Sequence, residues 1–191
     1  MTTRMTTHFK QLAELYMTMD RAWNETAAQY KFKCKGCEDN CCFSLFFHHT
    51  HVEKAYLHHG FSRLPQQDQE NIITRAKAYC NTTFDQNGPD AVASKKAPCP
   101  LLLDGRCRLY EFRPMICRMH GLPHELHKPG FQIFKGPGCD AGRFEEHDYV
   151  PFDRTPFYRN MAAIEMNFRS IASKTGKIKE TIAQMLLNTC P

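Results

Sequence analysis

The residues of this chain with the clearest chemical potential are its cysteines, which number ten in 191 residues. Four of them form a C-x2-C-x3-C-C run over residues 34–42, and a C-x2-C loop can wrap both sulfurs around one ion or cluster edge. Four others are dispersed through segments that contain proline or glycine. The predicted metal ligands are Cys34, Cys37, Cys41, Cys42, Cys99, Cys107, Cys117 and Cys139.

The alternative to metal ligation is a disulfide network, and the N-terminus argues against it. Charged residues interrupt the first residues of the chain, which therefore hold no apolar run long enough for an export signal. Without such a signal, cysteines are typical of reduced thiols and metal sites, and we predict a cytoplasmic protein. Cys80 is interpreted as a small buried hydrophobic residue on a predicted helix, and Cys190 as an incidental thiol.

Basic residues lie close to the predicted ligands. The formal net charge of +5 is mild for this length and does not indicate a nucleic-acid partner. Cations beside thiols lower the thiol pKa and offset thiolate charge, so we assign the nearby basic residues to that role. These residues are Lys31, Lys33, Lys35, Arg106, Arg108, Arg113 and Arg118.

The spacing of the cysteines bears on the identity of the metal. Structural zinc sites usually pair a C-x2-C with a second close pair, whereas this chain has a single C-x2-C. A compact run with distant further ligands also occurs in iron–sulfur proteins, so we favour an iron–sulfur cluster over zinc. Eight thiolates could hold two zinc ions, one cluster with spare thiols, or two clusters. Histidines that could replace a thiolate, each with less support, are His48, His49, His51, His120, His124 and His127.

Hydrophobic periodicity and turn residues predict the elements that must position these thiols. Apolar residues at three- and four-residue steps predict a long helix over 7–30. Thr50 and Glu53 form a capping box for a second helix, which Gly60 is expected to end. Further predicted elements are a strand over 43–49, a helix over 66–80, a surface loop over 81–96, a short helix within 113–119, a strand over 131–134, and helices over 155–173 and 177–187.

A β-hairpin is predicted in the middle of the chain. Asp104-Gly105 is a strong signal for a tight hairpin turn, and Cys99 and Cys107 lie on either side of it. The two strands would therefore present these two thiols near each other.

The predicted fold is α+β and mostly helical, with helices at both ends around an irregular, cysteine-rich centre that contains the hairpin. We expect a single metal-binding domain over residues 1–191, with a cysteine-cluster core at about 32–142 and flanking helices at 7–30 and 156–187. No stretch approaches ~18 consecutive apolar residues, so no membrane partner is expected. The chain lacks a phosphate-binding loop, a dinucleotide fingerprint and a nucleophile elbow, and no catalytic residue is assigned.

The run CKGCEDNCC, followed by CPLL, GRCRLYEFRPMICR and PGCDAG, resembles the YkgJ-like family of cysteine-cluster proteins, described as zinc- or iron-chelating. The resemblance spans roughly residues 32–142. It implies that the family's cysteines fall on the eight predicted ligands, with Arg113, Pro114 and Arg118 matching its RPxxCR element. One branch resembles iron–sulfur flagellin lysine methylases, but those chains are much longer and that activity is not transferred.

The sequence is compatible with three functions. In the one we favour, an iron–sulfur cluster has a redox or catalytic role and contacts a substrate. In the second, zinc or iron is structural and an outer surface binds a protein partner. In the third, the chain acts as a metal store, sensor or chaperone.

Overall fold

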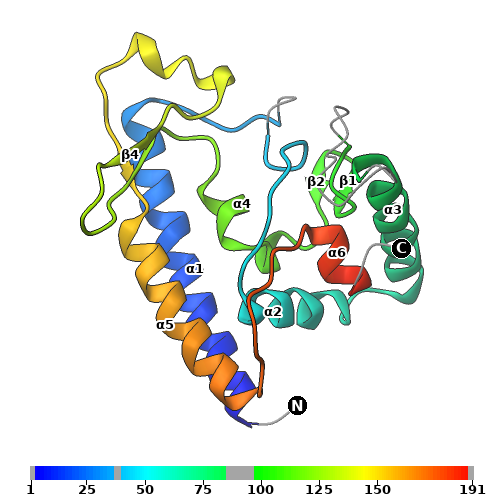
Figure 1. The fold of residues 1–191 in the computed structure, drawn as a ribbon. Helices are drawn as coiled ribbons and strands as arrows, with labels where there is room; N and C mark the ends of the chain where they lie inside the picture. The colour runs from blue at the N-terminus through cyan, green and yellow to red at the C-terminus, as the bar shows by residue number, and fades with distance from the viewer. Residues whose placement is uncertain (1–2, 37–39, 85–96, 189–191) are drawn as a thin grey trace. The chain divides into compact units, whose positions relative to one another are not determined.

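The computed structural model describes residues 3–36, 40–84 and 97–188, and its contacts divide the chain into two compact units (Figure 1). The first unit comprises Met1–Asn40 and Met115–Thr175. The second comprises Cys41–Pro114 and Gly176–Pro191. The predicted α+β, mostly helical fold class is confirmed. The single domain expected over the whole chain stays a prediction.

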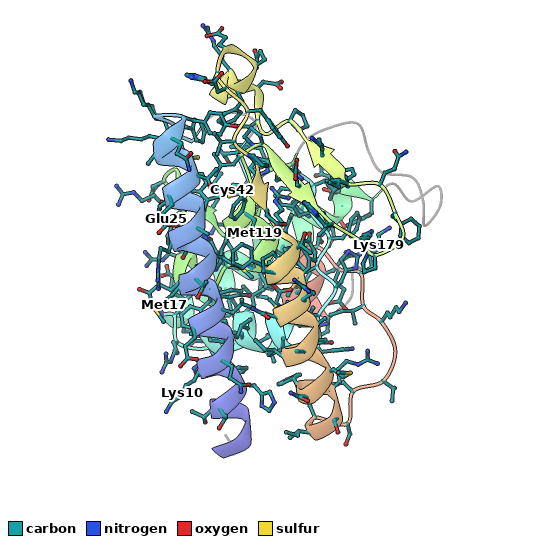
Figure 2. All side chains as sticks on the ribbon, turned by 90° about the vertical axis from the view of Figure 1, so that its left-hand side faces the viewer. Lys10, Met17, Glu25, Cys42, Met119 and Lys179 are labelled. Carbon is teal, nitrogen blue, oxygen red and sulfur yellow. The ribbon has the colours of Figure 1, made fainter. Side chains whose placement is uncertain are left out.

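Two long helices form the frame of the first unit. Helix α1 (Thr3–Gln29) packs along α5 (Thr155–Ile171) and also contacts the short α4 (Met115–Met119). Its apolar side chains recur at helical spacing and are buried, whereas Lys10, Met17 and Glu25 lie on the side away from α5 (Figure 2). The buried side chains of α1 include Phe9, Leu12, Leu15, Tyr16 and Met19.

A three-stranded sheet completes the first unit, in the order β4-β3-β5. Strand β3 (His124–Leu126) pairs antiparallel with β4 (Phe134–Gly136) and parallel with β5 (Phe152–Asp153). The strand predicted over 131–134 is wrong in its bounds, because the chain turns there: the Phe131 N–H donates to the Lys128 carbonyl at 3.1 Å. Two 3₁₀ turns, η2 (Asp140–Gly142) and η3 (Phe144–Glu146), follow β4.

Three helices form the second unit. Helix α2 (His51–Phe61) begins as predicted, since the Glu53 N–H donates to Thr50 Oγ1, but it continues through Gly60. Helix α3 (Gln66–Thr83) packs on α6 (Ile182–Leu187). Because α3 runs to Thr83, the loop predicted from residue 81 starts later, and the remainder of that loop lies outside the described residues.

The segment before α6 is extended, so the helix predicted over 177–187 is too long by its first five positions. His48 and Glu180 exchange backbone hydrogen bonds of 2.7 and 3.0 Å, which an α-helix at residue 180 would not permit. Thr181 then caps α6 in a capping box with Gln184. The strand predicted over 43–49 is likewise wrong, because only His48 takes part in a bridge.

The predicted hairpin is confirmed in the second unit. Strands β1 (Leu102–Leu103) and β2 (Arg106–Cys107) pair antiparallel, with Leu102 opposite Cys107. Asp104 (φ 48°) and Gly105 (φ 74°) both adopt positive φ, as a type I′ turn requires. The 3₁₀ turn η1 (Tyr110–Phe112) follows the hairpin and packs on α2.

None of the helices in the described parts of the chain combines the length and the apolarity that crossing a bilayer demands.

Candidate metal centre

Four of the eight predicted ligands lie together in the second unit. The Cys99 N–H donates to the Cys42 carbonyl at 2.7 Å, which attaches the start of the hairpin to the Cys41-Cys42 pair. The Leu102 N–H donates to the Cys99 carbonyl at 2.9 Å, and Leu102 is paired with Cys107 across the hairpin. The backbone therefore links the four cysteines in one place, although 56 residues separate Cys42 from Cys99.

The shifted pKa values of the Cys41 and Cys99 thiols indicate the same proximity. The adjacent Cys42 side chain and then burial raise the pKa of Cys41 well above the usual value for a thiol. Burial raises the pKa of the Cys99 thiol to about 12, and the nearby Cys107 and Cys41 add to that shift. Thiols that disfavour each other's ionisation in this way are close neighbours. A metal ion relieves the repulsion, because it binds the deprotonated sulfurs.

Two arginines carry positive charge to these thiols. Arg113 opposes the rise in the pKa of Cys41, as the sequence predicts, and its guanidinium lies 3.8 Å from the centre of the Tyr110 ring. Arg75, on α3, opposes the rise in the pKa of Cys99. Arg75 is not evident as a site residue from the sequence, because it lies 24 residues before Cys99 in a segment without a motif.

Other predicted compensating cations have carboxylate partners of their own. Arg108 donates to Asp68 Oδ2 from both Nε (3.1 Å) and Nη2 (2.5 Å). In the first unit, Arg118 pairs with Asp20 at 2.5 Å and stacks on Tyr16, with only 4% of its side chain exposed. The assignment of Arg108 and Arg118 to thiolate compensation is therefore replaced by these ion pairs.

The remaining predicted ligands belong to the first unit. Cys34 is exposed after α1, Cys117 is half-buried on α4, and Cys139 is buried. The Cys139 N–H donates to the Gly121 carbonyl at 3.0 Å, and its sulfur lies 3.9 Å from the position a Cβ on Gly121 would take. Cys37 lies outside the described residues. The grouping of Cys34 and Cys37 with Cys41 and Cys42 stays a prediction.

The thiols of the described residues meet the chemical requirements of a metal ion, but their arrangement does not match its coordination geometry. Within the described ranges, no three cysteine, histidine, aspartate or glutamate side chains converge closely enough to hold an ion without adjustment. The donor chemistry does fit, because four soft sulfur ligands share one neighbourhood with two guanidinium groups.

The histidines near the first cysteine run serve the fold of the second unit. Burial lowers the pKa of His48 to about 3, with a smaller contribution from His49, so its ring is neutral at physiological pH. His49 Nδ1 lies 3.2 Å from the Ile178 carbonyl, and His58 Nε2 lies 2.8 Å from the Met185 carbonyl. A ring nitrogen beside a carbonyl oxygen must donate, so these bonds fix the tautomers and hold the segment that includes α6.

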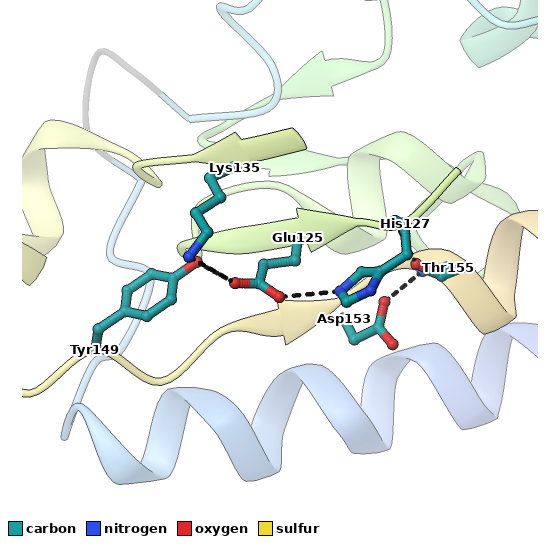
Figure 3. Close-up of polar contacts among 6 residues, drawn as sticks. All are labelled: Glu125, His127, Lys135, Tyr149, Asp153 and Thr155. Carbon is teal, nitrogen blue, oxygen red and sulfur yellow. Dashed lines mark hydrogen bonds and ion pairs between the residues drawn. The ribbon is translucent and has the colours of Figure 1, made fainter. Parts of the chain in front are cut away.

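The histidines of the first unit also have partners (Figure 3). His124 Nδ1 donates to the Leu122 carbonyl at 3.2 Å. Figure 3 shows His127, Lys135 and Tyr149 around the Glu125 carboxylate. Their polar atoms lie 3.0, 3.2 and 3.2 Å from its oxygens, respectively. Burial acts to raise the pKa of Glu125, but the hydrogen bonds from these three residues outweigh it and lower the pKa overall. The cluster therefore joins β3, β4 and the segment before β5 through an ionised carboxylate.

Cys80 differs from the sequence interpretation. It is buried, as expected, in a core cluster with Ala76, Tyr79 and Ala183. It is also disulfide-bonded, so it is not simply a small hydrophobic residue. Its partner is not one of the seven free cysteines of the described residues, and Cys190 lies outside those residues.

Comparison with known proteins places this cysteine constellation in a family. A family model described as "CxxCxxCC: Putative zinc- or iron-chelating domain" matches residues 33–133, which is more than half of the chain. The chain belongs to this CxxCxxCC family. Searches of curated proteins and of solved structures gave no match.

The CxxCxxCC match bears on the site in two ways. It confirms the resemblance predicted from the cysteine runs and supports metal binding as the general property of the chain. Its bounds include Cys34 through Cys117 but end before Cys139. The prediction of Cys139 as a ligand therefore rests on the sequence pattern alone.

Proposed function

We propose that this CxxCxxCC protein binds metal through a centre formed by Cys41, Cys42, Cys99 and Cys107. The observation that supports this proposal best is the backbone link from Cys42 through Cys99 to the hairpin that carries Cys107. Cys34, Cys37, Cys117 and Cys139 complete the proposed set of eight ligands.

We further propose that the metal is iron in an iron–sulfur cluster with a redox or catalytic role. The all-sulfur donor set and the adjacent Cys41-Cys42 pair support this choice, since the spacing lacks the second C-x2-C of a paired zinc knuckle. A bound cluster would supply one-electron transfer. Arg75 and Arg113 would offset its negative charge.

A structural zinc site is the second candidate. The attachment of Cys99 and Cys107, on either side of a tight turn, to the remote Cys41-Cys42 pair is what a structural ion would stabilise. In this case an outer surface would bind a protein partner. The turn between β3 and β4 offers such a surface, because Phe131 and Phe134 are 76% and 59% exposed.

Anaerobic purification followed by analysis of iron, acid-labile sulfide and zinc separates the two candidates. Iron and sulfide in similar amounts, with visible charge-transfer absorption, would support the cluster. Colourless protein with zinc and no iron would reject the cluster and support the structural site. Full retention of metal against a strong chelator would also exclude a role as an exchangeable metal store.

A further inference from the structure

A positively charged side chain on α3 reaches the hairpin of the proposed centre. Arg75 Nη1 donates to the Leu102 carbonyl at 2.8 Å. Leu102 is the residue that is both hydrogen-bonded to Cys99 and paired with Cys107. The guanidinium therefore attaches to the hairpin between two proposed ligands.

The charge of Arg75 has no carboxylate partner in the described part of the chain. Its Nε is buried there without a hydrogen-bond acceptor, and the Leu102 carbonyl is the single acceptor of its side chain. A buried, unpaired donor on a cation is costly, so an anion is expected beside it. Arg108, which also joins the hairpin region to α3, shows the contrast, because Asp68 accepts both of its hydrogen bonds.

Among the described residues, the anions that the site can supply to Arg75 are thiolates. One divalent ion with four thiolate ligands carries a net charge of −2, and such a centre needs nearby positive charge in a partly buried location.

We propose that Arg75 is a positioning residue of the metal centre, whose guanidinium offsets the charge of the metal–thiolate group and offers its buried Nε–H to a sulfur. This inference rests on the proposed function. It differs from a purely structural role, in which Arg75 serves only to hold the Leu102 carbonyl.

Three variants of the full chain distinguish these roles. Arg75→Gln keeps a planar donor but has no charge and is shorter, whereas Arg75→Lys keeps the charge and most of the reach and loses the planar donor group. Arg108→Gln is the matched control, since its charge is already paired with Asp68. Affinity for Zn²⁺ alone is measured on reduced, metal-free protein by competition with a chromophoric chelator, and folding is monitored by circular dichroism.

The charge role predicts about 10- to 100-fold weaker Zn²⁺ binding for Arg75→Gln, a smaller loss for Arg75→Lys, and no change for Arg108→Gln. Wild-type affinity in a folded Arg75→Gln protein, or equal losses in the Gln and Lys variants, would overturn the inference. If the Gln variant does not fold, the Lys variant decides: affinity near that of wild type supports the charge role, and a loss as large as 100-fold contradicts it. A wild-type chain that binds neither Zn²⁺ nor iron would instead reject the proposed function itself.

Discussion

Gly60 is the position where a single added methyl group should disturb the proposed centre from a distance. An alanine Cβ at this position of α2 would lie 2.3 Å from Phe112 Cγ and 2.9 Å from Phe112 Cβ. The Phe112 ring also packs on Tyr56, with ring centroids 4.9 Å apart. Because the clash includes Phe112 Cβ, rotation of the ring cannot remove it, and η1 must move.

The magnitude follows from two opposing terms. Overpacking of this kind costs up to about 3 kcal/mol of unfolding free energy. Alanine gains about 1 kcal/mol over glycine in a helix interior. We therefore expect Gly60→Ala to destabilise the metal-free protein by about 2 kcal/mol. Arg113 follows Phe112 directly and acts on Cys41, so metal affinity should fall as well.

A double-mutant cycle with Phe112→Ala isolates this clash. The assay is urea unfolding of the four proteins, reduced and metal-free, followed by circular dichroism. In the Phe112→Ala background the two closest contacts, with ring atoms at 2.3 and 2.5 Å, are absent and only the 2.9 Å contact with the Cβ of residue 112 remains. Gly60→Ala should therefore destabilise that background by clearly less than it destabilises wild type. A neutral or stabilising Gly60→Ala in the wild-type background would refute the reasoning, because it would mean that α2 and η1 do not pack as described.

Three further predictions concern the frame of each unit. The pKa of His48 is lowered from 6.5 to about 3, so below pH 6.5 the unfolded chain takes up a proton that the folded chain does not. The free energy of unfolding is therefore full above pH 6.5 and falls by about 1.4 kcal/mol per pH unit below it. Urea unfolding at pH 7.5 and 5.5 should show that loss in wild type but not in His48→Gln. Asp20→Asn leaves the buried Arg118 without its carboxylate and should cost about 1–3 kcal/mol in thermal or urea unfolding, whereas Glu25→Gln, on the exposed side of the same helix, should change little. Thr181→Ala removes the capping box of α6 and should cost about 1 kcal/mol, with faster amide hydrogen exchange in α6; unchanged exchange would contradict the cap.

The elements that the sequence predicted well are those specified by adjacent residues. Thr50 and Glu53 are three positions apart and cap α2 as expected. Asp104 and Gly105 form the turn that brings Cys99 and Cys107 together. In each case the signal and the structure that it specifies lie within a few residues of each other.

The features that the sequence did not reveal depend on distant pairing. Strand β3 is held by β5, with His124 opposite Phe152, and no periodic pattern marks a three-residue strand. The residues before α6 have helical propensity, yet Glu180 pairs with His48 instead. Arg75 acts on thiols far along the chain, so its place in the site depends on the packing of α3 rather than on any motif.

The central claim is that Cys41, Cys42, Cys99 and Cys107 form one metal centre. The most direct measurement is the metal content per chain of anaerobically purified wild type beside Cys99→Ser, with Cys80→Ala, which removes a disulfide-bonded cysteine outside the proposed set, as a control. We predict that wild type and Cys80→Ala retain metal and that Cys99→Ser loses it, together with any visible absorption. Equal metal content in wild type and Cys99→Ser would contradict the claim.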